Sequence, residues 1–209
     1  MKTAILANGH IANLQKLLPS ILEHQRIVAV DAGLVYCHQA NLTPHLLVGD
    51  FDSCPKELLD AYQTVPKKSL AVDKDETDLE IAIQEEWKRG AETVTLFGAW
   101  GNRLDHSLTN ALILGRHPFK LRLETETEVA FAISGAVKLS CFIGQTISLI
   151  PLFGPARGIR TSGLKWELNN GTLDQNFIGI SNVSLKPQIS IEIQSGLLLC
   201  CQVKNLLSD

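Results

Sequence analysis

The stretch LLVGDFDSCPKE, residues 46–57, joins a short apolar run to a turn that carries two carboxylates. Leu46, Leu47 and Val48 have the composition of a buried strand, and Asp50 and Asp52 follow almost directly. Ionised carboxylates this close repel each other, and a divalent cation between them would remove the repulsion. The stretch is equally compatible with a polar turn, because Gly and Asp are common turn formers.

The first half of the chain alternates short apolar runs with helical patterns. The apolar runs are TAILA (3–7), RIVAVDAG (26–33), HLLVGDFD (45–52) and TVTLFG (93–98). The helical patterns are IANLQKLLPSILEH (11–24), LVYCHQAN (34–41), DLEIAIQEEWKRG (78–90) and LDHSLTNALILGR (104–116). Strands that alternate with helices form parallel βαβ units. We therefore expect an α/β fold that begins with a Rossmann-like, three-layer domain, its parallel sheet covered on both faces.

Small and polar residues follow each of these apolar runs. They are Asn8-Gly9, Asp31-Ala32-Gly33, Gly49-Asp50-Phe51-Asp52 and Gly98-Ala99-Trp100-Gly101. Ligands of parallel sheets bind beyond the carboxyl ends of the strands. The four turns therefore predict a binding site at one edge of the sheet.

The helical period disappears after about residue 122. Short β runs follow, divided by Gly, Pro and Asn: EVAFAI (128–133), VKLSCF (137–142), TISLIPLF (146–153), GLKWEL (163–168), ISIEIQ (189–194) and GLLLCCQV (196–203). This pattern is typical of a small antiparallel β-sandwich. We predict an α/β domain over residues 1–121 and a β-sandwich domain over residues 122–209.

The composition limits the classes of partner. The chain has 209 residues, 45% hydrophobic and 20% charged, and a formal net charge of -3. It has no basic stripe for nucleic acid and no apolar run long enough to span a membrane. The polar Asn-Gly-His at positions 8–10 interrupts the N-terminal apolar run, which predicts a cytoplasmic protein without a signal peptide. Five cysteines without a CxxC spacing predict reduced, structural thiols.

A second acidic group precedes the helical pattern that begins near residue 78. Asp73, Asp75, Glu76 and Asp78 lie within six positions. Thr77 and Glu80 have the spacing of a capping box, which accounts for part of the group by helix formation alone. Asp73 and Asp75 lie outside that explanation. With Asp50 and Asp52 they favour a site for a hard cation such as Mg²⁺, held by carboxylates, waters and substrate phosphates.

The third polar group lies in FGAWGNRLDHSLTN, residues 97–110. Glycines at 98 and 101 allow close approach of a ligand to the backbone, and Asp105 or a neighbour would cap the next helix. Arg103 is suited to phosphate because its guanidinium donates two parallel hydrogen bonds. The alternative is a surface ion pair between Arg103 and Asp105.

Four of these motifs, in this order and spacing, resemble the thiamine pyrophosphokinase family. They are VDAG (30–33), GDFDS (49–53), DKDETDLEIAI (73–83) and GAWGNRLDHSLTN (98–110). GLKWEL (163–168) and Ser181-Asn182 look like the family's C-terminal motifs. The family has an α/β catalytic domain followed by a β-sandwich, so the resemblance spans nearly the whole chain. One departure is Ala32, where the family usually has a glycine.

The resemblance implies transfer of an intact diphosphoryl group from ATP to the hydroxyl of thiamine, with Mg²⁺, in a homodimer whose thiamine site lies at the subunit interface. It implies metal ligation by Asp50, Asp52 and Asp78. The matched positions are Asp50, Asp52, Asp75, Asp78 and Arg103 for catalysis, Gly33, Asp73, Thr77, Arg103 and Asp105 for the nucleotide, and Trp166, Ser181 and Asn182 for thiamine. Either Asp75 or Asp73 would orient or deprotonate the hydroxyl.

Two other functions fit parts of the sequence. Asp50-Phe51-Asp52-Ser53 has the DxDx[ST] pattern of haloacid-dehalogenase-like phosphatases, although that motif belongs on the first strand of its domain. A non-catalytic nucleotide or vitamin sensor could share the fold. The phosphate loop GxxxxGK[ST], the dinucleotide motif GxGxxG after a strand and the serine nucleophile elbow are absent from the sequence.

Overall fold

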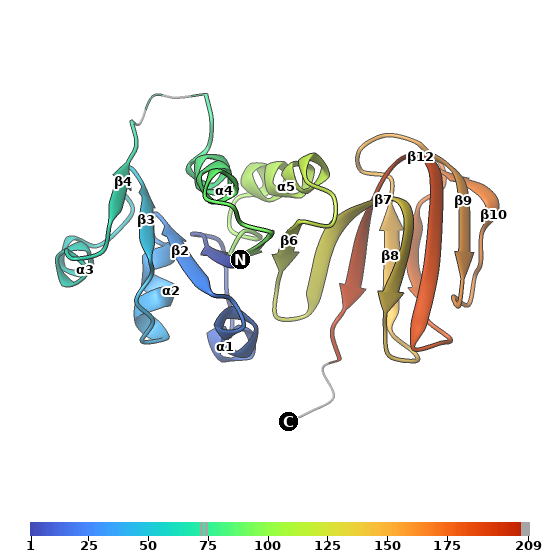
Figure 1. The fold of residues 1–209 in the computed structure, drawn as a ribbon, viewed down its shortest axis with the longest axis horizontal. Coiled ribbons are helices and arrows are strands. Elements are labelled where there is room, and N and C mark those ends of the chain that lie inside the picture. Colours follow the sequence, from blue (N-terminus) through green and yellow to red (C-terminus); the bar gives the residue numbers. More distant parts are fainter. Residues whose placement is uncertain (72, 74, 206–209) are drawn as a thin grey trace. The chain divides into compact units, whose positions relative to one another are not determined.

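A computed structural model describes residues 1–71, 73 and 75–205 (Figure 1). The chain forms two compact units. The first comprises Met1–Asn110 and Leu123–Glu126, and the second comprises Ala111–Arg122 and the residues from Thr127 onward. Each unit has its own hydrophobic core.

The first unit contains a parallel sheet with strand order β5-β1-β2-β3-β4. The strands are β1 (Lys2–Leu6), β2 (Arg26–Val30), β3 (Leu46–Gly49), β4 (Lys67–Ser69) and β5 (Thr93–Phe97). Four of the five are buried along almost their whole length, the short edge strand β4 being the exception. Burial on both faces explains why these strands read as continuous apolar runs instead of alternating ones.

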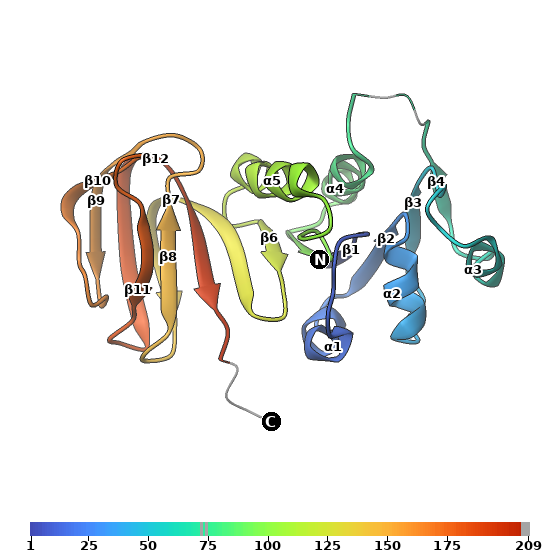
Figure 2. The same ribbon diagram turned by 180° about the vertical axis from the view of Figure 1, so that it is seen from behind.

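Helices cover both faces of this sheet (Figures 1 and 2). Helices α1 (Leu14–Leu22) and α2 (Gly33–Gln39) bury Leu17, Ile21 and Leu34 against one face, in a core shared with β1, β2 and β3. Helix α4 (Asp78–Lys88) contacts the opposite face. The short α3 (Lys56–Ala61) follows β3, and α5 (Leu104–Ile113) with the 3-10 turn η1 (Leu114–Arg116) leads into the second unit.

The predicted capping box at the start of α4 is confirmed. The Thr77 Oγ1 accepts a hydrogen bond from the Glu80 N–H at 3.2 Å, and the Glu80 carboxylate accepts one from the Thr77 N–H at 3.1 Å. These bonds satisfy two donors that a helix start otherwise leaves unpaired. They fix the point at which α4 begins, and with it the position of Asp78.

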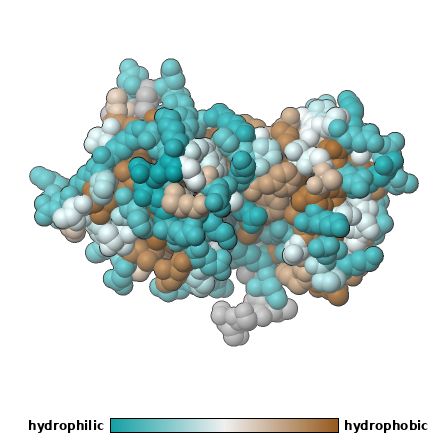
Figure 3. All heavy atoms as spheres, viewed as in Figure 1, coloured by the Kyte–Doolittle hydropathy of each residue, from teal (hydrophilic) through white to brown (hydrophobic). Residues whose placement is uncertain are grey.

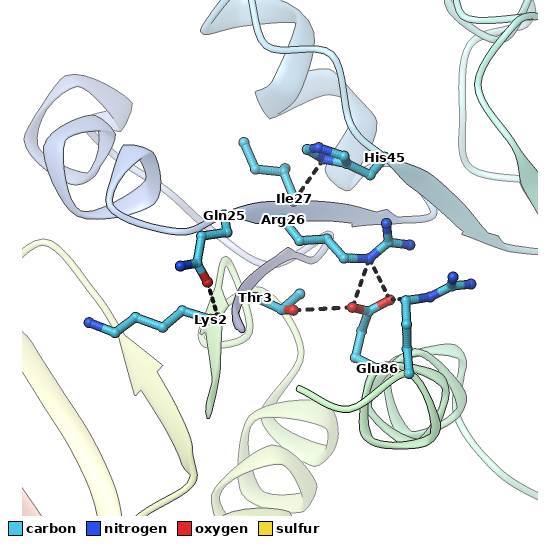
Figure 4. Close-up of polar contacts among 8 residues, drawn as sticks. Lys2, Thr3, Gln25, Arg26, Ile27, His45 and Glu86 are labelled. Carbon is cyan, nitrogen blue, oxygen red and sulfur yellow. Dashed lines mark hydrogen bonds and ion pairs between the residues drawn. The ribbon is translucent and has the colours of Figure 1, made fainter. Parts of the chain in front are cut away.

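A buried ion pair joins the other end of α4 to the amino ends of two strands (Figure 4). Glu86 is fully buried, and its carboxylate receives Arg26 Nε at 2.8 and 3.0 Å and Thr3 Oγ1 at 3.1 Å. Arg89 Nε lies 3.9 Å from the same carboxylate. Both oxygens of Glu86 therefore have donors, as a buried charge requires.

The second unit is antiparallel throughout its described strands. Its longest strands, β7 (Glu128–Ser140) and β12 (Gln188–Val203), pair along their length. The other strands are β8 (Thr146–Ile150), β9 (Ala156–Ser162), β10 (Asn169–Leu173) and β11 (Gly179–Val183), while β6 (Leu121–Glu124) crosses the boundary between the units. The first half of β12 pairs with β9 and its second half with β8, so two sheets share the β7–β12 ribbon.

The core between these sheets contains residues from β7, β8, β9, β10 and β12, among them Phe131, Ile147 and Ile191. The predicted architecture, a parallel α/β domain followed by an antiparallel β-sandwich, is confirmed. On the face seen in Figure 3, hydrophilic residues predominate over the first unit and a group of hydrophobic residues is exposed on the second. No helix in the described part of the chain is long and apolar enough to cross a bilayer.

The strand divisions differ from those expected. The runs 128–133 and 137–142 belong almost entirely to the single strand β7, and the runs 189–194 and 196–203 form the single strand β12. Gly135 and Gly196, which read as breaks, lie at an irregularity in the β7–β12 pairing and both have positive φ. The run GLKWEL forms no strand and makes only an isolated bridge from Leu164 to Ser184.

Candidate active site

A pocket of about 590 Å³ lies in the first unit, beyond the carboxyl ends of its parallel strands. Its wall is formed by residues that follow β1, β2, β3 and β5, by the start of α4 and by α5. The lining residues are Ala7, Asn8, Gly9, Val30, Asp31, Asp50, Asp52, Ser53, Glu76, Thr77, Asp78, Leu79, Gly98, Ala99, Gly101, Asn102, Arg103, His106 and Asn110. The four polar turns noted in the sequence thus meet at one edge of the sheet.

Three carboxylates converge on this pocket. One oxygen each from Asp31, Asp50 and Asp78 lies within 4.8 Å of the other two. Asp31 follows β2, Asp50 follows β3 and Asp78 is the first residue of α4. All three are partly buried. We call these residues the carboxylate cluster.

The backbone around the cluster adopts conformations that most residues avoid. Asp31 has φ 49° and Phe51 has φ 62°, although neither is glycine. Gly49 has φ 145°, and a side chain there would collide with the Asp31 carboxylate. Strained backbone of this kind persists where the surrounding structure holds it, and it concentrates at functional sites.

The electrostatics of the cluster favour a cation. Burial raises the pKa of Asp31 to about 7, and a hydrogen bond with Asp78 and the charges of Asp78 and Asp50 act in the same direction. The Asp31 Oδ1 atom is buried without a hydrogen-bond partner. A buried carboxylate oxygen normally has a partner, so this atom indicates a ligand. Oxygen ligands from several carboxylates suit a hard divalent ion such as Mg²⁺.

The other acidic residues lie around the cluster. Asp52 lines the pocket with an exposed side chain, and its N–H donates to Asp50 Oδ1 at 3.1 Å. Asp73 and Asp75 are exposed and do not belong to the described lining, whereas their neighbour Glu76 does. The structure therefore brings together Asp50 and Asp78 of the three predicted metal ligands and places Asp52 beside them.

Arg103, on the loop that follows β5, lines the pocket and is paired with Asp105. Arg103 Nη2 lies 2.6 Å from Asp105 Oδ2, and both side chains are exposed. The Arg103 guanidinium holds the pKa of Asp105 at about 2. The ion pair that was the alternative for Arg103 therefore exists, at a residue that also lines the pocket.

Side chains of α5 hold the loop that carries Arg103. Ser107 Oγ accepts from the Gly101 N–H at 3.0 Å and donates to the Arg103 carbonyl at 2.9 Å. Asn110 is buried and donates to the Ala99 carbonyl at 2.8 Å. Neither was assigned a role from the sequence, and both fix the backbone of this pocket wall.

Gly33, predicted to approach the nucleotide, lies outside the described pocket lining. It begins α2 and is buried against β1, where a side chain would collide with the Leu6 carbonyl. The close packing of α2 on β1 therefore explains why a glycine is present at position 33.

The residues predicted for thiamine lie in the second unit. The Trp166 side chain is exposed, with the Lys165 ammonium 4.6 Å from its ring centre. Asn182 grips the backbone of Trp166, since its Nδ2 donates to the Trp166 carbonyl at 2.7 Å and its Oδ1 accepts from the Trp166 N–H at 3.1 Å. Ser181 is exposed beside it with φ 57°. Trp166 is therefore a surface residue, not a core one.

Asp31 was not among the site residues assigned from the sequence. A signal was present, because Asp31 follows an apolar run and precedes a glycine, in the same way that Asp50 follows β3. Two carboxylates at the ends of neighbouring parallel strands lie close together. That rule alone would have added Asp31 to the cluster.

Comparisons with known proteins agree with this architecture. The family model for the thiamin pyrophosphokinase catalytic domain matches residues 18–125, and that for the thiamin pyrophosphokinase vitamin B1 binding domain matches residues 135–198. Thiamine pyrophosphokinase of Bacillus subtilis is 28% identical over 181 residues, which cover 81% of this chain and 83% of that protein. Thiamine pyrophosphokinase 2 of Arabidopsis thaliana is 27% identical over 225 residues, covering 92% and 84%.

Solved structures show the same fold. The structure of thiamin pyrophosphokinase from Geobacillus thermodenitrificans matches with a TM-score of 0.88 and 25% identity, covering 99% of both chains. Yeast thiamin pyrophosphokinase has a TM-score of 0.78 at 15% identity and covers 97% of this chain and 86% of that one. Matches of this extent, in the same domain order, place the chain in the thiamin pyrophosphokinase family.

Proposed function

We propose that the protein transfers the diphosphoryl group of ATP to the hydroxyl of thiamine, giving thiamine diphosphate and AMP. The observation that carries the proposal is the carboxylate cluster in the pocket of a chain whose two units match the two domains of this family. Diphosphoryl transfer needs positioning and charge neutralisation more than a protein nucleophile, because the hydroxyl of the substrate attacks.

Mg²⁺ is the ion that this cluster fits best. Asp31, Asp50 and Asp78 would hold it, with Asp52 beside them, and the unpartnered Asp31 Oδ1 supports this assignment. When bound, the ion would draw the phosphate oxygens together and offset their negative charge. Without it, like charges would face the triphosphate from one side of the pocket.

Arg103 in the pocket, and a carboxylate just outside its described lining, would bind and orient the substrates. Arg103 would exchange its exposed partner Asp105 for phosphate oxygens, with two parallel donors. One carboxylate, Asp75 or Asp73, would orient or deprotonate the thiamine hydroxyl; both side chains are exposed, and they lie shortly before the pocket residues Glu76 and Thr77. Proton acceptance by a carboxylate at that point completes the attack on the β-phosphorus.

The thiamine site is proposed for the second unit, at the interface of a homodimer. Trp166 offers an exposed aromatic face for a cationic heteroaromatic ligand, Ser181 offers a polar group beside it, and Asn182 would hold the Trp166 backbone in place at this site. The second unit also exposes several large apolar side chains, which a partner subunit would cover. They are Phe142, Ile143, Phe177, Ile178, Ile180 and Leu185. A cytoplasmic location, where ATP is available, is part of the same proposal.

One assay tests the function against its two alternatives. The purified protein with Mg²⁺, ATP and thiamine should release AMP and thiamine diphosphate in equal amounts. A phosphatase would release inorganic phosphate without a need for thiamine, and a sensor would bind without turnover. Neither alternative is favoured, since the Asp50-Phe51-Asp52-Ser53 motif follows β3 instead of the first strand of the unit. Absence of AMP release that depends on thiamine would refute the proposal.

A further inference from the structure

The loop Asn8–Asn13 joins β1 to α1 and contributes Asn8 and Gly9 to the pocket wall. Backbone hydrogen bonds attach it to the loop that follows β5. The Gly9 N–H donates to the Gly98 carbonyl, and the His10 N–H donates to the Trp100 carbonyl at 3.0 Å. A side chain at position 9 would collide with that second loop. The two loops therefore form one continuous wall made largely of backbone groups.

The hydroxyl of a tyrosine outside the pocket lining holds this loop by two hydrogen bonds. Tyr36, on α2, donates its hydroxyl hydrogen to the Gly9 carbonyl at 2.6 Å and accepts from the Ile11 N–H at 3.3 Å. The hydroxyl thus bonds the residues on both sides of His10. Tyr36 itself is not part of the described pocket lining.

A carboxylate holds the far end of the same loop. Glu126 Oε1 accepts from the Ala12 N–H at 2.6 Å and from the Asn13 N–H at 3.0 Å. Asn13 is in turn the N-cap of α1, with its side chain accepting from the Gln15 N–H. Glu126 belongs to the short segment Leu123–Glu126 that returns to the first unit. Residues distant in sequence therefore fix both ends of the loop.

We propose that Tyr36 and Glu126 are positioning residues for ATP. They hold Asn8 and Gly9 in the pocket wall, where the Asn8 carbonyl accepts from Asn102 Nδ2 at 3.4 Å. This wall follows β1 and β5, whereas the carboxylate cluster follows β2 and β3 and begins α4. A nucleoside triphosphate held at the cluster meets this wall with its remaining surface, and a wall already fixed loses little conformational entropy on binding. The inference rests on the proposed function for the identity of the nucleotide.

The two tyrosines of the chain provide a matched pair of variants. Tyr36→Phe removes the hydroxyl from the loop. Tyr62→Phe removes a hydroxyl that bonds the Leu42 carbonyl at 3.4 Å, outside the described pocket lining. We expect Tyr36→Phe to raise KM and the dissociation constant for Mg-ATP about fivefold, with kcat changed less than about twofold, and Tyr62→Phe to change neither. Hydrogen exchange over residues 8–13 should accelerate in Tyr36→Phe alone.

Glu126 provides an independent pair. Glu126→Ala removes the acceptor, whereas Glu126→Gln keeps an oxygen that can accept both N–H groups. We expect Glu126→Ala to weaken Mg-ATP binding about fivefold and Glu126→Gln to restore most of it. An unchanged KM for ATP in Tyr36→Phe and Glu126→Ala would overturn the proposal. The proposal would also be overturned if kcat fell as much as KM rose in these variants and both changes followed only a lower melting temperature.

The direct binding measurement separates this inference from the proposed function. If the wild-type protein binds Mg-ATP but forms no thiamine diphosphate, the proposed function is refuted. The ATP dissociation constants of the variants then still test whether Tyr36 and Glu126 position the loop for ATP. If the wild type is active and both loop variants bind Mg-ATP like the wild type with unchanged exchange over residues 8–13, the positioning role fails alone.

Discussion

The carboxylates at the two ends of helix α4 have opposite surroundings. At its C-terminal part, Glu86 is buried at the amino ends of β1 and β2 and receives hydrogen bonds from Arg26 and Thr3 (Figure 4). At its start, Asp78 meets Asp31 and Asp50 at the carboxyl end of the same sheet, and Asp31 retains a buried oxygen without a partner. One end pairs its negative charge within the protein, and the other gathers negative charges together.

The difference separates a structural role from a ligand-binding one. A buried charge whose oxygens all have donors stabilises the fold it belongs to, or at least costs it little. A carboxylate held among other carboxylates in strained backbone raises the energy of the fold until a cation arrives. The following predictions test whether this division is real, from the largest effect to the smallest.

The largest effect should come from the cluster itself. Asp50→Asn and Asp78→Asn should fold normally and lower kcat/KM about a thousandfold or more, because each removes one ligand charge from the proposed metal site. Steady-state kinetics at saturating Mg²⁺ measures this. Asp52→Asn sharpens the result: an equal loss would make Asp52 a metal ligand, as the family resemblance implies, and a smaller loss would restrict the ligands to the cluster.

Glu86→Ala should reduce stability and leave the activity unchanged, the reverse of the cluster variants. We expect it to lower the free energy of unfolding by about 3 kcal/mol, because Arg26 and Thr3 lose the carboxylate that satisfies them. The kcat of the protein that remains folded should not change. Urea unfolding and kinetics on the same sample measure both. Glu85→Ala is the control, since Glu85 pairs with the partly exposed Lys68 and the exposed Lys88; a comparable loss of stability there would remove the distinction.

Asp31 predicts an unusual pH dependence. Its pKa is raised from 3.8 to about 7, so between these values the native state binds more protons than the unfolded state. The stability that Asp31 contributes to the metal-free protein should therefore be fully present below about pH 3.8 and be lost as pH rises through about 7. Asp31→Asn should remove this slope and stabilise the metal-free protein at pH 8 by about 1–2 kcal/mol, a figure reduced for solvent screening. The free energy of unfolding is measured against pH with a chelator present. Equal slopes for the wild type and Asp31→Asn would contradict the raised pKa of Asp31.

The smallest effect concerns the exposed ion pair. Arg103→Lys should lower kcat/KM for ATP about tenfold, since an ammonium cannot reproduce the two-donor contact to phosphate. Asp105→Asn should leave the melting temperature unchanged, unlike the loss of Glu86, because exposed pairs contribute little to stability. Wild-type kinetics in Arg103→Lys would reduce the residue to a surface ion pair.

The sequence predicted the parallel sheet and the site edge well, for a physical reason. Strands buried on both faces are continuous apolar runs, and their turns carry the polar residues, so β1, β2, β3 and β5 and the turns after them could be read directly. The Thr77–Glu80 capping box likewise depends on a local spacing. Asp50 and Asp78 follow from these two features.

Features that depend on tertiary contacts could not be read. Gly135 and Gly196 look like turns, yet pairing of β7 with β12 absorbs them into one irregular ribbon. Three strands with few apolar residues, β9, β10 and β11, had no pattern to reveal them. The hydroxyl of Tyr36 and the carboxylate of Glu126 reach the pocket loop across 25 or more positions, and no local spacing encodes those contacts.

The carboxylate cluster can be tested directly with Mn²⁺, which replaces Mg²⁺ and scatters anomalously. In a crystal of the wild-type protein grown with Mn²⁺, an anomalous peak should lie about 2.0–2.3 Å from carboxylate oxygens of Asp31, Asp50 and Asp78. The peak should be lost in Asp31→Asn, whose fold is otherwise unchanged. A peak elsewhere in the pocket, or one that persists in Asp31→Asn, would contradict the claim that these three carboxylates form the metal site.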